Sequence, residues 1–175
     1  MADFRIREAL LTDAGGIAKV HVRTWQSAYS GLVPDSYLQS LTVELRTITW
    51  IRNIENALPK TRILIAEWEN QIVGFLSVGA SREIGPASQG EIFAIYVDPK
   101  FQGQSIGSTL MSGGIQTLKN DGFTTAILWV LHDNLPTRSW YESHGWKADG
   151  ESKLDRQHDF VLTEVRYGIE LLPKN

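Results

Sequence analysis

The stretch from Gln89 to Lys119 constrains the fold of this chain most, because it joins a strand, a turn and a helix. Residues 92–97 are apolar and rich in β-branched side chains, which predicts a buried strand. Pro99 follows, and a proline cannot donate a ladder hydrogen bond, so the strand is expected to end there. Apolar residues then recur at helical spacing from Ile106 to Leu118. A chain of 175 residues is expected to build one domain, residues 1–175, around this unit.

The turn between this strand and this helix carries glycines, Gly103 and Gly107, in the run from Gln102 to Ser108. At the N-terminus of a helix, several backbone N–H groups have no helical partner and the helix dipole favours negative charge. A glycine-bearing turn that leads into a helix is therefore a place for an anion. The sequence predicts that these backbone groups can cradle a diphosphate.

The rest of the chain supplies further strands and helices, recognised by alternating or apolar runs and by helical spacing after capping residues. The expected order is a strand at 4–7, helices at 12–28, 34–41 and 43–56, a hairpin of 63–67 and 72–78, the strand and helix described above, a strand at 125–131, a helix from Asn134 to Gly145, a short strand at 146–148, a charged loop at 151–159 and a last strand at 160–171. A connecting helix makes its two strands parallel. The expected fold is α/β, with a mixed, mainly antiparallel central sheet, one parallel strand pair and flanking helices.

Composition excludes several classes of function. The net charge is −3 and no run of Lys or Arg is present, so a nucleic-acid partner is not expected. The absence of cysteine removes disulfides, thiolate metal sites and cysteine nucleophiles, and no pair of histidines has metal-ligand spacing, so no metal is expected. The N-terminus mixes charges early without a long apolar segment. We therefore expect a cytoplasmic protein without a membrane partner.

At Gln102, Gly103 and Gly107 the sequence resembles the GCN5-related N-acetyltransferase (GNAT) family, which carries Gln/Arg-x-x-Gly-x-Gly/Ala after a strand. In that family the turn holds the pyrophosphate of acetyl-CoA, so the resemblance implies a GNAT-like fold and acetyl-CoA as co-substrate. Ser105 departs from the pattern, because the family usually has glycine there. Serine keeps the backbone amide but lacks the freedom of glycine at positive φ. The resemblance covers nearly the whole chain and is specific from about Glu91 to Trp146.

The resemblance also implies which residues bind the cofactor. The backbone of residues 95–97 is expected to pair with the pantetheine amides as a neighbouring strand would, provided that this strand splays away from 125–131. The alternative is an unbroken ladder between the two strands. Asn134 matches a residue that contacts the pantetheine arm, and it can cap the following helix as well. The implied set is Ile95, Tyr96, Val97, Gln102, Gly103, Gln104, Ser105, Ile106, Gly107, Ser108, Asn134 and Tyr141.

Two residues match catalytic positions of the family. Glu91, eleven residues before Gln102, matches a glutamate that acts as general base in many members. The alternative for Glu91 is an exposed carboxylate at the end of a strand. Tyr141 lies in a segment similar to the family's Asn…aromatic-Tyr…Gly helix, whose phenol donates a proton to the coenzyme's thiolate. The alternative for Tyr141 is a ring that packs in the core with its hydroxyl bonded elsewhere.

The family's acceptor pocket is implied to include Trp25, Tyr29, Glu91 and Phe93, although an aromatic cluster can also be core packing. The implied reaction moves an acetyl group to a primary amine of a small molecule, by direct attack with general-base assistance. Two alternatives stay open: an acetyltransferase for protein lysines or N-termini, and a non-catalytic acyl-CoA-binding regulatory module. The expected partners are therefore a small-molecule amine as acceptor and, because the family often dimerises, a second copy of the chain in a homodimer.

Overall fold

The structure is a computed structural model that describes residues 4–156 and 159–171. Its centre is a seven-stranded sheet with the strand order β1-β2-β3-β4-β5-β7-β6. The strands are β1 (Arg5–Glu8), β2 (Arg62–Trp68), β3 (Gln71–Ala80), β4 (Gln89–Val97), β5 (Thr125–Leu131), β6 (Lys147–Asp155) and β7 (Leu162–Glu170). The pair β4–β5 is parallel and the other neighbours are antiparallel. The predicted mixed sheet with one parallel pair is thereby confirmed.

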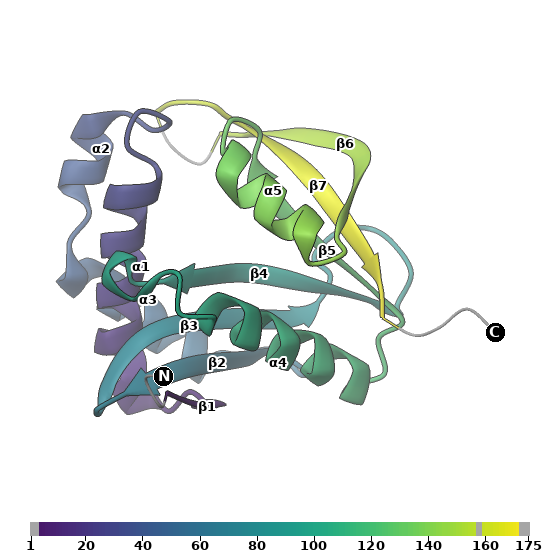
Figure 1. Ribbon diagram of the computed structural model, residues 1–175, viewed down its shortest axis with the longest axis horizontal. Coiled ribbons are helices and arrows are strands. Elements are labelled where there is room, and N and C mark those ends of the chain that lie inside the picture. The colour runs from purple at the N-terminus through teal and green to yellow at the C-terminus, as the bar shows by residue number, and fades with distance from the viewer. Residues whose placement is uncertain (1–3, 157–158, 172–175) are drawn as a thin grey trace.

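Helices cover both faces of the half of the sheet that holds β1 to β4 (Figure 1). The helices are α1 (Ala14–Ala28), α2 (Asp35–Ser40), α3 (Val43–Glu55), α4 (Ile106–Asn120) and α5 (Leu135–Ser143), and the 3-10 turns are η1 (Leu11–Asp13) and η2 (Pro99–Phe101). Helices α1 and α3 lie on one face and α4 on the other, while α5 packs beside β5 and β7. No helix in the described part of the chain is both long and apolar enough to cross a membrane.

Helix α4 sits close to the sheet because its inner face combines large apolar residues with a glycine. Leu110, Met111 and Leu118 are fully buried in the main core cluster, where each contributes about 1.5–3 kcal/mol from burial. A Cβ at Gly114 would lie 2.7 Å from a methyl group of Leu76. The glycine therefore allows α4 to pack closely against β3.

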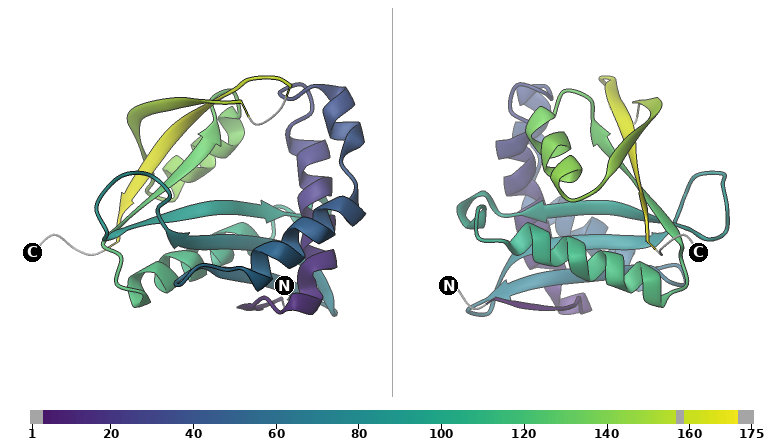
Figure 2. Two further views of the ribbon diagram at one scale, coloured as in Figure 1. Left: turned by 180° about the vertical axis from the view of Figure 1, so that it is seen from behind. Right: turned by 45° about the vertical axis from the view of Figure 1, so that its right-hand side comes forward.

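The two parallel strands separate part of the way along their length. They pair with each other from Gln89↔Thr125 to Ile92↔Leu128. Beyond that point β4 continues to Val97 and β5 to Leu131 without pairing to each other. A β-bulge adds Phe93 to β4 at this point, since Ser77↔Ala94 is followed by Val78↔Ile92 in the β3 register. A bulge bends its strand. Figure 2 shows the two halves of the sheet diverging. The predicted splay is present, and the alternative of an unbroken ladder is wrong.

The last hairpin differs from the sequence expectation. The segment from Glu151 to Asp155 was expected to be loop, but it belongs to β6, which pairs with β7 from Lys147↔Gly168 to Asp155↔Leu162. Residues 157–158 of that expected loop lie outside the described residues. The strand tolerates its charges because β6 is at the edge of the sheet and is largely exposed. The longer strand brings Lys153 and Asp155 next to the opening between β4 and β5.

Candidate active site

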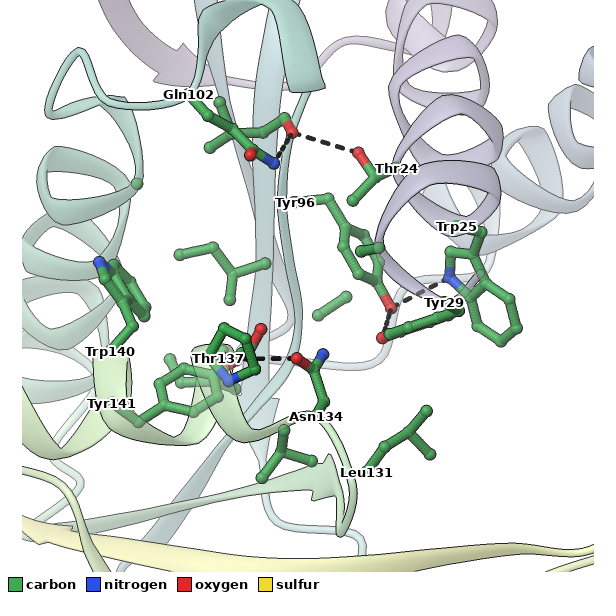
Figure 3. Close-up of a pocket in the computed structure, with 18 of the residues that line it drawn as sticks. Thr24, Trp25, Tyr29, Tyr96, Gln102, Leu131, Asn134, Thr137, Trp140 and Tyr141 are labelled. Carbon is green, nitrogen blue, oxygen red and sulfur yellow. Dashed lines mark hydrogen bonds between the residues drawn. The ribbon is translucent and has the colours of Figure 1, made fainter. Parts of the chain in front are cut away.

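A cavity of about 580 Å³, here called the main cavity, lies where β4 and β5 separate (Figure 3). The end of β4, the following turn and the start of α4 form one wall, and β5 with α5 forms the other. Trp25 of α1 and Tyr29 just after this helix line one end, and the last hairpin contributes Asp155 and Glu164. Residues from four separate regions of the sequence therefore face one space.

A second cavity of about 550 Å³, here called the outer pocket, adjoins the main cavity. Residues common to the walls of both are Ile92, Phe93, Trp129, Asp155 and Glu164. The outer pocket is also lined by Arg82, Glu91, Lys153, Leu154 and Arg156. The shared wall makes the acidic side chains of the last hairpin accessible from both spaces.

The turn from Gln102 to Gly107 holds two residues in the left-handed conformation. Gly103 has φ +77° and Ser105, which precedes α4, has φ +63°. Such turns point successive backbone N–H groups toward one point and add them to the free N–H groups of the helix start. Gln102 fixes the turn to β4, because its Nε2 donates to the carbonyl of Val97 at 3.3 Å. The geometry has the form of an anion cradle at one end of the main cavity.

The conformation of Ser105 leads to a test of stability. Ser105 already carries a Cβ in the left-handed region, where a side chain costs about 1–2 kcal/mol, and the branched Cβ of Ser105→Val adds crowding, so this variant should have a lower free energy of unfolding than the wild-type protein. Ser105→Gly should raise it by less than about 1 kcal/mol, because the freer unfolded chain offsets part of the gain. Urea unfolding of the three proteins measures this order. Equal stability of the Val and Gly variants would contradict the assigned backbone conformation.

Gly107, near the start of α4, lies against Trp140 of α5. A Cβ at this position would be 3.3 Å from the indole ring of Trp140 and 3.7 Å from a methyl group of Val97. Both neighbours are parts of the cavity wall. A larger side chain at position 107 must therefore displace either the start of α4 or the Trp140 ring.

Tyr141 is buried and lines the main cavity (Figure 3). Its ring lies 5.3 Å from that of Trp140 and 6.2 Å from that of Tyr167. Burial, and secondarily the charge of Tyr96, raise the pKa of the Tyr141 phenol above its ordinary value, so the hydroxyl is protonated near neutral pH. The ring packs in the core, and the residue also forms part of the cavity wall, while its role as proton donor to the thiolate stays a prediction.

Asn134 and Tyr96 are held by hydrogen bonds at the edge of the same space. Asn134 is 6% exposed, and its Oδ1 accepts a 3.4 Å hydrogen bond from the Thr137 N–H, so it caps α5 while lining the cavity. The Tyr96 hydroxyl accepts a hydrogen bond from Trp25 Nε1 at 3.1 Å and lies 3.4 Å from the Tyr29 hydroxyl. These bonds tie the end of β4 to α1 and fix the aromatic end of the cavity.

Glu91 is not the exposed carboxylate that one sequence interpretation allowed, because it is 1% exposed. It accepts three hydrogen bonds from Arg82, one from the backbone N–H and two from the guanidinium group. The same guanidinium lies 4.7 Å from the ring centre of Phe93. Glu91 lines the outer pocket and does not line the main cavity. Its assignment as a general base stays a prediction.

Glu164 is the acidic residue that sequence reasoning missed. It lies on β7, lines both spaces, and its side chain is 21% exposed. Its carboxylate is 3.5 Å from Nζ of Lys153. Desolvation by burial raises the pKa of Glu164, Asp155 adds to this, and Lys153 opposes it. Within the described residues, no group of His, Asp and Glu side chains has an arrangement that could hold a metal ion.

Both the sequence and the fold match known proteins. The model of the acetyltransferase (GNAT) family matches residues 23–146. An uncharacterized N-acetyltransferase of Bacillus subtilis is 31% identical over 150 residues, which are 86% of this chain and 84% of that protein. A mycothiol acetyltransferase of Brachybacterium faecium is 28% identical over 88 residues, which are 50% of this chain and 27% of that protein. The crystal structure of the PaiA N-acetyltransferase from Thermoplasma acidophilum in complex with coenzyme A superposes with a TM-score of 0.75 at 20% identity, covering 96% of this chain and 99% of that one.

Proposed function

Because the chain belongs to the GNAT family of acetyltransferases, we propose that it transfers the acetyl group of acetyl-CoA to a primary amine of a small molecule. The observation that carries this proposal is the main cavity, which joins an anion cradle at one end to an aromatic and acidic region at the other. A cavity with these two ends suits a long phosphorylated co-substrate and an amine that meet inside it.

The proposed placement of acetyl-CoA uses backbone groups at two places: the N–H groups of the turn before α4, and the part of β4 that does not pair with β5. The diphosphate would accept hydrogen bonds from N–H groups of the turn and the start of α4. The pantetheine arm would lie along residues 93–97 of β4, where the pairing with β5 has ended. The thioester would then reach Tyr141, which lines the cavity (Figure 3).

The proposed reaction is direct attack. The amine nitrogen adds to the thioester carbonyl, the C–N bond forms and the C–S bond breaks. Tyr141 donates its proton to the departing thiolate, which suits a phenol whose pKa is raised by burial. Holding both reactants in one cavity supplies most of the remaining acceleration, because the attack becomes effectively intramolecular.

The closed acceptor end supports a small molecule rather than a polypeptide. The rings of Tyr37 on α2 and Phe160 before β7 meet edge-to-face at 5.0 Å. They extend an apolar cluster of Val33, Leu38 and Leu131. This contact joins the α1–α2 region to the last hairpin beyond the cavity, where a peptide chain would need an open groove.

Release of free thiol from acetyl-CoA tests the proposal. The purified protein is assayed with a panel of small amines, amino acids, polyamines, aminoglycosides and peptides, and coenzyme A binding is measured by calorimetry. We expect thiol release that depends on a small amine. Release with peptides alone would assign the protein to the protein acetyltransferases. Coenzyme A binding without turnover on any acceptor would identify a binding module.

A further inference from the structure

We propose that Glu164, with Asp155 beside it, binds the ammonium group of the acceptor and takes its first proton, so that the acceptor is a cationic amine. This inference rests on the proposed function, since it names the residues and the substrate class at the acceptor end of the main cavity. It assigns to β7 a role that the family resemblance gave to Glu91 on β4.

The charges of the cavity wall support this assignment. Among the described residues that line the main cavity, the charged ones are Asp155 and Glu164, and both are acidic. Glu164 lies opposite Leu131 of β5 and Lys153 of β6 in the strand register. The nearby aromatic rings of Trp25 and Tyr29 offer faces that attract a cation. Two carboxylates beside aromatic rings, without a basic side chain in the same wall, select a positively charged group.

Glu91 is less suited to the proton transfer than Glu164. The carboxylate of Glu91 is engaged by three hydrogen bonds from Arg82 and faces the outer pocket. Protonation of Glu91 would disrupt this ion pair, in which a buried carboxylate accepts its hydrogen bonds from the more exposed Arg82. Among the described residues, Lys153 forms an ion pair with Glu164 at 3.5 Å and is also 3.8 Å from Glu83, while Arg82 acts on Glu164 through its charge. Glu164, unlike Glu91, lines the main cavity, so its carboxylate can meet an acceptor bound there.

Several titratable groups face Glu164, and its pKa depends on burial and on the charges among these groups. They are Lys153 and Asp155 on β6, Arg82 from the β3–β4 connection, the hydroxyls of Tyr29 just after α1 and of Tyr96 on β4, and Glu91 and Arg156 in the outer pocket. Burial first, and then Asp155, raise the pKa of Glu164 above its ordinary value of 4.5, against the opposing effect of Lys153 and Arg82. A raised pKa makes the carboxylate a stronger base than an exposed one. The carboxylate of Glu164 can accept a proton at pH values above its pKa, and this basicity is lost as the pH falls through that pKa.

The bound ammonium gives one proton to Glu164, and the neutral nitrogen attacks the thioester carbonyl. As the adduct collapses, the C–S bond breaks and Tyr141 protonates the thiolate. The second nitrogen proton restores the phenol directly or through water, and Glu164 returns its proton to solvent. The overall reaction yields an amide, a free thiol and one proton.

Binding of two matched probes tests the charge selection. The probes are 2-phenylethylamine, which is cationic at pH 7, and 2-phenylethanol, its uncharged analogue, titrated into the complex with coenzyme A. We expect wild-type protein to prefer the amine by about tenfold or more, as a nearby opposite charge of low exposure allows. In Glu164→Gln this preference should largely vanish. Lys153→Gln is the control: it removes the ion-pair partner and should keep or increase the preference. An unchanged preference in Glu164→Gln, or no binding of the amine to wild-type protein, overturns the inference.

The pH dependence of kcat/KM separates proton transfer from binding. At pH 7, Glu164→Gln should reduce kcat/KM about 10²-fold, and the activity should recover with rising pH toward the pKa of the free amine, about 10.4 for an alkyl ammonium. Wild-type protein should instead lose activity only at acidic pH. Glu91→Gln is the matched control and should keep the wild-type profile shape. If wild-type protein turns over and Glu91→Gln alone shows the altered profile, the inference is wrong while the proposed function stands. If wild-type protein releases no thiol with any acceptor, the proposed function fails, and the probe titration still decides the charge selection.

Discussion

Replacing Tyr141 with Phe is expected to lower kcat about 10²-fold while leaving the Kd of acetyl-CoA nearly unchanged. The substitution removes only the hydroxyl of a residue that lines the cavity and keeps the ring, which contacts Trp140 and Tyr167. Without the phenol, water must protonate the thiolate, which makes the departure of the leaving group slower. Steady-state kinetics measure kcat, a single-turnover experiment shows that chemistry limits it, and calorimetry measures the Kd.

Tyr167→Phe is the control for this prediction. Tyr167 belongs to the same ring cluster but does not line the main cavity, and its hydroxyl bonds to Arg138 and Glu142. Its loss should reduce stability by about 1 kcal/mol and leave kcat near the wild-type value. A wild-type kcat in Tyr141→Phe, with chemistry limiting, would remove Tyr141 from the mechanism.

Replacing Gly107 with Val is expected to weaken coenzyme A binding by about 10- to 100-fold. A Cβ at this position already lies within 3.3 Å of Trp140, and the branched side chain must push the start of α4 away from α5. The displacement misplaces backbone N–H groups of the cradle, and losing one hydrogen bond to a charged group costs about 1.5–3 kcal/mol. Calorimetry with coenzyme A measures the effect, after circular dichroism has shown that the variant is folded.

Gln104→Ala is the matched variant for the cradle. It changes an exposed side chain in the same turn and keeps the backbone N–H, so the Kd of coenzyme A should change much less than in Gly107→Val. Unaltered affinity in a folded Gly107→Val protein would place the diphosphate elsewhere. Equal losses in both variants would show that side chains of the turn, rather than its amides, bind the co-substrate.

Local sequence signals were sufficient for the unit that holds the cradle. The apolar run of β4, the proline after it and the helical spacing of α4 all depend on neighbours within a few residues, so each could be identified without the fold. The same applies to Asn134, whose capping role follows from its place before α5. The left-handed Ser105 explains why a glycine is usual at that position.

Features that depend on contacts between distant segments could not be predicted. The bulge at Phe93 is defined only by the register against β3. Arg82, which binds Glu91, comes from a polar connection whose path the sequence does not specify. Glu164 lies on β7, which pairs with β5 on one side and with the edge strand β6 on the other. These pairings between distant segments determine the face of the sheet on which Glu164 lies. Because the charged part of β6 was interpreted as loop, the acidic end of the cavity was missed.

A crystal structure of the protein with coenzyme A tests the central claim most directly, because that claim is the placement of the co-substrate between β4 and β5. We expect the diphosphate oxygens within hydrogen-bonding distance of backbone N–H groups in residues 103–108, the pantetheine arm along residues 93–97, and the sulfur next to the Tyr141 hydroxyl. Coenzyme A bound outside the main cavity, or strands β4 and β5 paired along their full length in the complex, would contradict the account.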